Sequence, residues 1–329
     1  MSYKAPPTGT YVPTLSFWKD RWNETPDLGT FRRHLERLSD DGVRGVTLFS
    51  YFGEGPYVSA VERGQFLEIA SETLKPKGVI ILVECSSESL QETSQKMADA
   101  KKGGADYAFL SVPMGYLDEL DLEDIFEYFA EVSEWSDLPF VVRAPSGDVK
   151  ISFSPEFIDR LASIPNCVGC LMPAFSPAIQ GVAEKFAGGD DFAIFVTYPG
   201  DVGPKRLRIR LQGSIGNITP VTLVKFYDDP DGRVLETINA ILTTKVLRDI
   251  ATKVTALKYA MTRVRGYGGT CRPPLPVPHR ELTARVDPIL PSLAGDFAQR
   301  RWMALDGIDI HDESTGSGLR RAGTFTPRG

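Results

Sequence analysis

The sequence lacks long apolar stretches and an excess of basic residues. No run of about 18 apolar residues occurs, so we expect no membrane span and no membrane partner. The segment from Met1 to Pro7 has no apolar region of the kind that secretory signals carry, and we expect a cytoplasmic protein. The 37 Lys and Arg stand against 43 Asp and Glu, a net charge of −6. This balance argues against nucleic acid as a partner, because phosphate binding requires clustered positive charge.

Cysteine and histidine are also scarce. Cys167 and Cys170 have a C-x-x-C spacing, but no second pair exists to complete a zinc site. Redox pairs usually lie at a helix N-terminus, whereas this pair lies in an apolar, strand-like run, so we interpret it as buried packing. The three histidines are His34, His279 and His311, and none follows a predicted strand. The sequence therefore predicts no metal site and no cofactor.

Short apolar runs alternate with helical patterns along most of the chain. The runs are at 11–17, 43–49, 78–84, 107–112, 138–145, 164–171, 192–197 and, more weakly, 213–218. Most are continuously apolar, which is typical of strands buried on both faces. Eight such strand–helix units favour a closed (β/α)8 TIM barrel over an open sheet. No G-x-G-x-x-G motif follows the first run, which argues against dinucleotide binding.

The domain organisation follows from where this alternation stops. Residues 1–231 are predicted to form the barrel, and the helical patterns of 232–304 to form a C-terminal helical extension of the same domain. Residues 305–329 are polar and rich in glycine, with no periodicity, and we interpret them as a flexible polar tail. A partner-binding arm is the alternative, because this segment also carries several arginines.

Five segments then occur in an informative order: Gly9–Thr14, Gly42–Gly55, Ala98–Val112, Leu138–Leu171 and Gly266–Leu275. Together they resemble the dihydrodipicolinate synthase and N-acetylneuraminate lyase family of class I aldolases. The resemblance implies a (β/α)8 barrel with additional C-terminal helices. It also implies a homodimer or homotetramer, and chemistry in which a strand-end lysine forms an imine with a 2-oxo acid.

The resemblance fails at the positions that carry the family's chemistry. The family has two threonines in the turn after strand two and a tyrosine pair after strand four. It also has a tyrosine at the end of strand five, and the imine-forming lysine. The residues at these positions here are, in chain order, Tyr51, Phe52, Met114, Gly115, Arg143 and Leu171. Leucine has no amine, so an imine mechanism is not expected.

The candidate site is at the C-terminal ends of the strands, where barrel active sites lie. Glu84 and Arg143 both end otherwise apolar strands, where a charge needs a partner, so we predict that they share one environment. Arg143 would bind a carboxylate while Glu84 or Tyr51 moves a proton; a purely structural ion pair is the equal alternative. The substrate-binding candidates are Ser50, Phe52, Tyr116, Ser146, Leu171, Tyr198 and Asn217.

Three functions remain open at this point. The first is a lyase- or aldolase-like enzyme that acts on a small oxo or hydroxy acid, or on an aromatic carbonyl compound, by imine-free acid/base chemistry. The second is a catalytically inactive barrel that binds a metabolite or partners with an active paralogue. The third is a scaffold whose tail recruits a partner. The first is favoured, because charged and phenolic residues replace the lost groups, and it predicts a small-molecule ligand.

Overall fold

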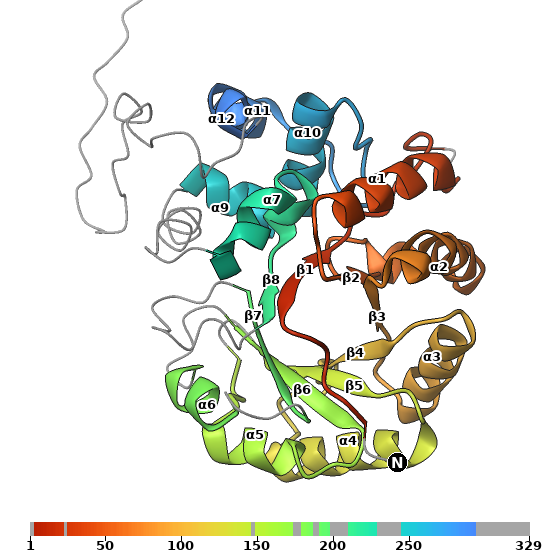
Figure 1. The fold of residues 1–329 in the computed structure, drawn as a ribbon, viewed down its shortest axis with the longest axis vertical. Coiled ribbons are helices and arrows are strands. Elements are labelled where there is room, and N and C mark those ends of the chain that lie inside the picture. The colour runs from red at the N-terminus through yellow and green to blue at the C-terminus, as the bar shows by residue number, and fades with distance from the viewer. Residues whose placement is uncertain are drawn as a thin grey trace, which may run out of the picture.

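Eight parallel strands form a closed barrel in the computed structural model, which describes residues 3–22, 25–145, 149–173, 179–186, 191–197, 210–228 and 245–293. Each strand pairs with the next along the chain, and β8 pairs with β1 (Figure 1). The strands are β1 Gly9–Pro13, β2 Gly45–Leu48, β3 Ile80–Glu84, β4 Tyr107–Ser111, β5 Phe140–Arg143, β6 Cys167–Met172, β7 Ala193–Val196 and β8 Arg210–Gln212. The predicted (β/α)8 barrel is confirmed.

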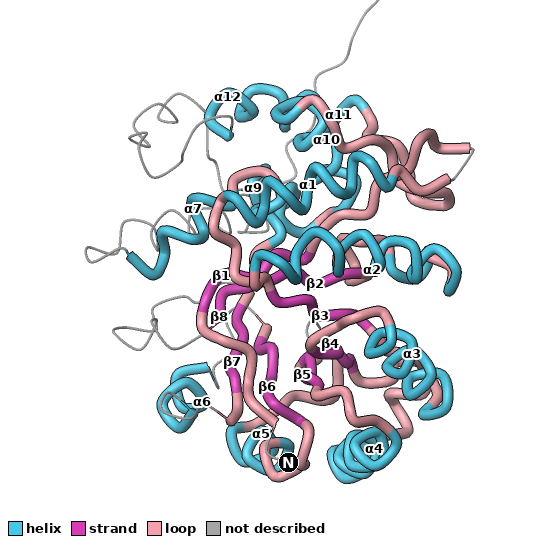
Figure 2. The backbone as a smooth tube through the Cα atoms, turned by 45° about the vertical axis from the view of Figure 1, so that its right-hand side comes forward, coloured by secondary structure: helices cyan, strands magenta, loops and turns pink. Residues whose placement is uncertain are grey.

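Helices that follow the strands form the outer layer. They are α1 Leu28–Asp40, α2 Ala60–Leu74, α3 Leu90–Lys102, α4 Leu122–Trp135, α5 Pro155–Leu161, α6 Ile179–Phe186 and α7 Pro220–Val224. Figure 2 shows α2 to α6 around the outside of the strands. The later helices α9 Lys245–Thr252, α10 Val254–Arg265, α11 Arg280–Val286 and α12 Leu290–Leu293 gather beside α1 and α7. No helix in these described parts is long and apolar enough to cross a membrane.

Side-chain caps fix where several helices begin. Asp27 accepts the Thr30 N–H at the start of α1, and Ser59 forms a reciprocal capping box with Glu62 at the start of α2. Asp121 forms a second capping box at the start of α4. Each cap satisfies backbone N–H groups that the first helical turn leaves without a partner. These starts follow the loops at the C-terminal ends of the strands and so help to fix those loops.

The N-terminal segment closes the opposite end of the barrel. Tyr107 donates from its hydroxyl to the Lys4 carbonyl (3.1 Å), and Arg210 Nε donates to the Pro6 carbonyl (2.8 Å). Ala5 packs against the apolar cluster inside the barrel, which comprises Tyr11, Leu82, Phe109, Val141, Val168, Leu171, Ala193 and Phe195. The barrel is therefore filled at its core and closed at its base. Its mouth, at the C-terminal ends of the strands, is the end where an active site would lie.

The eighth strand differs from the prediction. It is Arg210–Gln212, whereas the predicted segment 213–218 contains the 3-10 helix η4, Ser214–Asn217. Arg210 is the register partner of the interior residue Phe195, and Gln212 donates to the Thr47 hydroxyl (2.9 Å). Both polar side chains are buried and hydrogen-bonded within the protein, so the strand can be polar. For that reason no apolar run marks it in the sequence. The predicted tail 305–329 lies outside the described residues.

Candidate active site at the barrel mouth

Glu84 and Arg143 meet at the mouth of the barrel. Glu84 is the last residue of β3 and Arg143 the last of β5, and Arg143 Nη2 lies 2.7 Å from Glu84 Oε2. The guanidinium carbon of Arg143 also lies 5.2 Å from the ring centroid of Phe109, on the intervening strand β4. The Glu84 side chain is 13% exposed and that of Arg143 29%. The prediction that these two groups share one environment is confirmed.

Ser86 holds the second oxygen of the Glu84 carboxylate and is itself held by the backbone of Ser111. The Ser86 hydroxyl donates to Glu84 Oε1. The same hydroxyl oxygen accepts the Ser111 backbone N–H at 2.6 Å. The carboxylate is thus held by a guanidinium on one oxygen and by a hydroxyl on the other, which fixes its orientation at the mouth.

Arg143 keeps donors that the described residues do not use. Its Nη2 atom donates to Glu84, and no described group accepts from Nε or Nη1. Nη2 carries two N–H bonds and Glu84 takes one of them, so the second can act beside the N–H of a neighbouring nitrogen and bind a carboxylate with two parallel hydrogen bonds. The arrangement can therefore hold an acid next to the Glu84 carboxylate.

The turn after β2 brings three of the predicted residues to this end of the barrel. Phe49 and Glu54, at either side of the turn, both have left-handed backbone conformations, with φ of 58° and 53°. Tyr51 is 56% exposed and its ring packs edge-on against Phe52. Ser50 is 3% exposed, and its hydroxyl has no hydrogen-bond partner among the described residues. A buried hydroxyl without a partner is costly, and a substrate oxygen that reached it would supply the missing partner.

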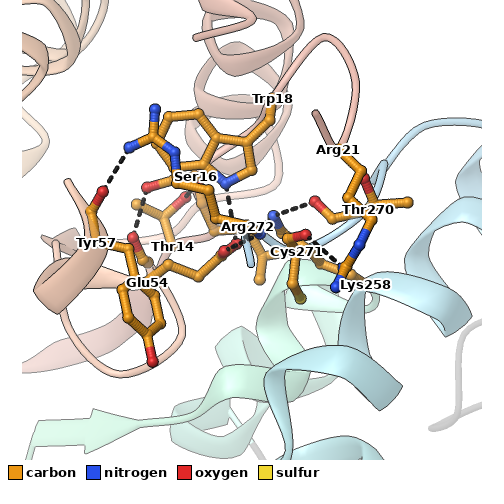
Figure 3. A network of polar contacts seen from close by, with 12 residues as sticks. Thr14, Ser16, Trp18, Arg21, Glu54, Tyr57, Lys258, Thr270, Cys271 and Arg272 are labelled. Atoms are coloured by element: carbon orange, nitrogen blue, oxygen red, sulfur yellow. Dashed lines mark hydrogen bonds and ion pairs between the residues drawn. The ribbon is translucent and has the colours of Figure 1, made fainter. Parts of the chain in front are cut away.

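A fully buried ion pair holds this turn, and the sequence reasoning missed it. Glu54 Oε1 accepts from Lys258 Nζ and from Trp18 Nε1 (3.2 Å), and Oε2 accepts the Arg272 backbone N–H (2.7 Å). Figure 3 shows Lys258 and Arg272 reaching Glu54 from the C-terminal helical region. Lys258 also donates to the Thr270 carbonyl (3.1 Å). The Lys258 amine is thus occupied and is not a free nucleophile.

Leu171 lies at the interior face near the end of β6. It is 6% exposed, and its register partners are Arg143 on β5 and Phe195 on β7. Thr47 and Gln212, which the sequence reasoning did not select, contribute a hydrogen-bonded polar pair from β2 and β8. In the sequence, Gln212 is marked only as a polar residue beside the weak run 213–218. A polar residue in that place is equally typical of a loop. The interior beside Arg143 is therefore apolar at Leu171 and polar at the β2–β8 side.

The assignment of Asn217 as a substrate-binding residue is wrong. Its Oδ1 atom accepts from Leu15 N (3.2 Å) and lies 2.9 Å from His34 Nε2. Its Nδ2 atom donates to the carbonyls of Pro13 (3.0 Å) and Ser214 (2.7 Å). The residue is fully buried and all its hydrogen-bonding groups are used. Asn217 therefore joins β1, α1 and η4 and has nothing left for a ligand.

The remaining candidates have different outcomes. Tyr116 is in the loop after β4 and is 75% exposed, so it is available but not fixed by packing. Ser146 and Tyr198 lie outside the described residues. Cys167 and Cys170 are buried free thiols, and burial raises the pKa of Cys167 to about 12. A thiol so resistant to ionisation does not act as a nucleophile, in line with the packing interpretation.

Eight strands in a closed barrel, the helices that follow them and a charged pair at the strand ends define a (β/α)8-barrel protein with a polar site at its mouth. The model of the dihydrodipicolinate synthetase family matches residues 24–286, and the chain belongs to that family. The resemblance noted in the sequence is thereby confirmed.

Particular relatives agree with this assignment. The probable mitochondrial 4-hydroxy-2-oxoglutarate aldolase of Emericella nidulans is 26% identical over 291 residues, which cover 84% of this chain and 91% of that protein. The L-threo-3-deoxy-hexylosonate aldolase of Aspergillus niger is 28% identical over 167 residues, which cover 49% of each chain. The dihydrodipicolinate synthase structure from Thermotoga maritima has a TM-score of 0.76 at 18% identity, covering 87% of this chain and 98% of that one. The last of these likenesses concerns the fold alone.

Proposed function

We propose that this protein is an aldolase-type lyase that acts on a small 2-oxo acid bearing a hydroxyl group, by acid/base chemistry without an imine. The observation that carries the proposal is the Glu84–Arg143 pair at the mouth, with two donors of Arg143 left for a carboxylate. The interior position on β6 at which the family resemblance implies a lysine holds Leu171. The names of the two curated relatives support this class of substrate, since 4-hydroxy-2-oxoglutarate is a 2-oxo acid with a hydroxyl two carbons from its carbonyl.

In this mechanism Arg143 binds the carboxylate and carbonyl oxygens of the substrate. Glu84 takes the proton of the substrate hydroxyl, the carbon–carbon bond breaks, and an aldehyde is released. The electron pair of that bond moves to the carbonyl oxygen as an enolate, whose charge the guanidinium stabilises. The enolate carbon then takes the proton back from Glu84, which leaves a shorter 2-oxo acid. Ser86 keeps the Glu84 carboxylate in place, and the exposed Tyr51 is a second proton carrier.

The other mouth residues would bind the substrate chain. Ser50 would donate its buried, unpartnered hydroxyl to a substrate oxygen. Phe52 and Leu171 offer apolar surface, which also suits an aromatic carbonyl compound. Tyr116 would contact the outer end of the substrate. As the family resemblance implies, we further propose a homodimer or homotetramer, and we expect it in the cytoplasm.

The test uses racemic 4-hydroxy-2-oxoglutarate, with pyruvate release followed by coupled lactate dehydrogenase. We expect the wild type to form pyruvate and Glu84→Gln and Arg143→Met to lose at least about 100-fold in kcat/KM, as for loss of an acid/base or charge-stabilising group. Arg160→Met is the matched control, because Arg160 forms a similar pair with Glu123 (2.8 Å) on the outer helices. A panel of other hydroxylated 2-oxo acids and aromatic carbonyl compounds follows. A wild type inactive on the whole panel would refute the proposal in favour of an inactive barrel.

A further inference from the structure

Arg63 of α2 reaches the mouth from the outer layer of the barrel. Its Nη2 donates to the backbone carbonyl of Glu84, the last residue of β3. Its guanidinium carbon also lies 4.3 Å from the ring centroid of Phe49, the first residue after β2. Arg63 therefore contacts both the end of β3, which carries Glu84, and the first residue of the turn that carries Tyr51.

The carbonyl that Arg63 binds is at the place where the β2–β3 ladder stops. Ile80 N donates to Arg44 O, and Leu48 is the register partner of Val83. In a parallel ladder the next rung would bring the Ser50 N–H to the Glu84 carbonyl. Phe49 interrupts that path, because its left-handed backbone (φ 58°) turns the chain away from the strand direction. Arg63 thus supplies a donor to a carbonyl at the end of the sheet.

A second cation holds the other end of the same short segment. Lys96 of α3 donates to the Ser86 carbonyl at 3.1 Å. Arg63 thus fixes the carbonyl of Glu84, whose carboxylate is proposed to move the proton. Lys96 fixes the carbonyl of Ser86, whose hydroxyl holds that carboxylate. Without Arg63 the Glu84 carbonyl would lose this donor, and the backbone at the end of β3 would be held, among the described residues, only from the β4 side, by the Cys85 N–H on Phe109, and by Lys96.

We propose that Arg63 is a positioning residue that fixes the Glu84 carboxylate relative to the turn carrying Tyr51. The inference rests on the proposed function for its catalytic consequence, whereas its structural part concerns only residues 49–54 and 84–88. Displacing a catalytic group by about 1 Å costs up to roughly 100-fold in rate. The defect should therefore fall on turnover more than on binding, since Arg63 does not touch the carboxylate-binding donors of Arg143.

The experiment compares Arg63→Met and Arg63→Lys with Arg160→Met, all shown to be folded by circular dichroism. Arg160 is the matched control, because its guanidinium lies 4.3 Å from the Phe126 ring and pairs with Glu123, and both of these described partners are on α4. With 4-hydroxy-2-oxoglutarate we expect Arg63→Met to lower kcat roughly ten- to 100-fold while KM changes less than about threefold. Arg63→Lys should recover part of the loss, because it keeps a cation and a donor. A kcat for Arg63→Met equal to that of Arg160→Met would overturn the inference.

Hydrogen exchange separates this inference from the proposed function. Arg63→Met should raise amide exchange in peptides covering 49–54 and 84–88, and Arg160→Met should not. If the wild type cleaves no member of the panel, the proposed function fails, and the exchange result still decides whether Arg63 holds these segments. Unchanged exchange in both segments would overturn the positioning role whatever the activity.

Discussion

The buried pair of Lys258 and Glu54 gives the sharpest stability prediction. Their side chains are 1% and 0% exposed, and the other described donors to the Glu54 carboxylate are Trp18 Nε1 and the Arg272 backbone N–H. Lys258→Met keeps the length of the side chain and removes its charge. The buried carboxylate then has no counter-charge in contact, and breaking a buried pair in this way costs about 3–5 kcal/mol. The two remaining donors place the expected loss in the free energy of unfolding at the lower end, about 3 kcal/mol.

The assay is urea unfolding followed by circular dichroism, with the change in midpoint multiplied by the m-value. Lys75→Met is the control, because Lys75 forms an equally simple pair with Asp106 (2.6 Å) but is 39% exposed. Exposed pairs contribute at most about 1 kcal/mol. The double variant Glu54→Gln with Lys258→Met should recover part of the loss, since no buried charge remains. A Lys258→Met protein no less stable than Lys75→Met would refute the reasoning.

The remaining predictions concern the mouth, pH and assembly. Borohydride added with pyruvate should leave the intact mass unchanged, because Leu171 has no amine; a pyruvyl increment on any lysine near the mouth would contradict this. Arg143→Ala should lower the free energy of unfolding by only about 1 kcal/mol, because the pair is partly exposed, but should abolish stabilisation by pyruvate in a thermal shift assay; a loss of several kcal/mol would instead favour the structural pair. Burial and then nearby Arg37 lower the pKa of His34 from 6.5 to about 3. The unfolded chain therefore binds a proton that the folded chain refuses, and stability should fall as pH drops from about 6.5 toward 3, by up to about 1.4 kcal/mol per pH unit. His34→Gln should flatten this slope in urea unfolding at several pH values, and an unchanged slope would contradict the assignment. Sedimentation equilibrium should give a dimer or tetramer; a monomer near 36 kDa at micromolar concentration would disprove assembly.

The sequence alone determined the barrel and one ion pair at its mouth. Continuous apolar runs identify β2 to β7, because strands buried on both faces admit few polar residues. The position of the mouth follows from the fold, since parallel strands bring their C-terminal ends together. Glu84 and Arg143 could be predicted to meet for the same reason: each places a charge at the end of an apolar strand, and both project toward the barrel axis.

Only the tertiary structure decided what the other polar residues do. Asn217 looks like a strand-end ligand in the sequence, yet a 3-10 turn buries it among partners from distant segments. Lys258 is 204 positions from Glu54, and nothing in a single sequence indicates that such residues pair. Arg63 appears as an ordinary helix residue, although the fold directs it to the end of β3. Periodicity records which side chains are buried, but partners far apart in the chain are set by how the elements pack.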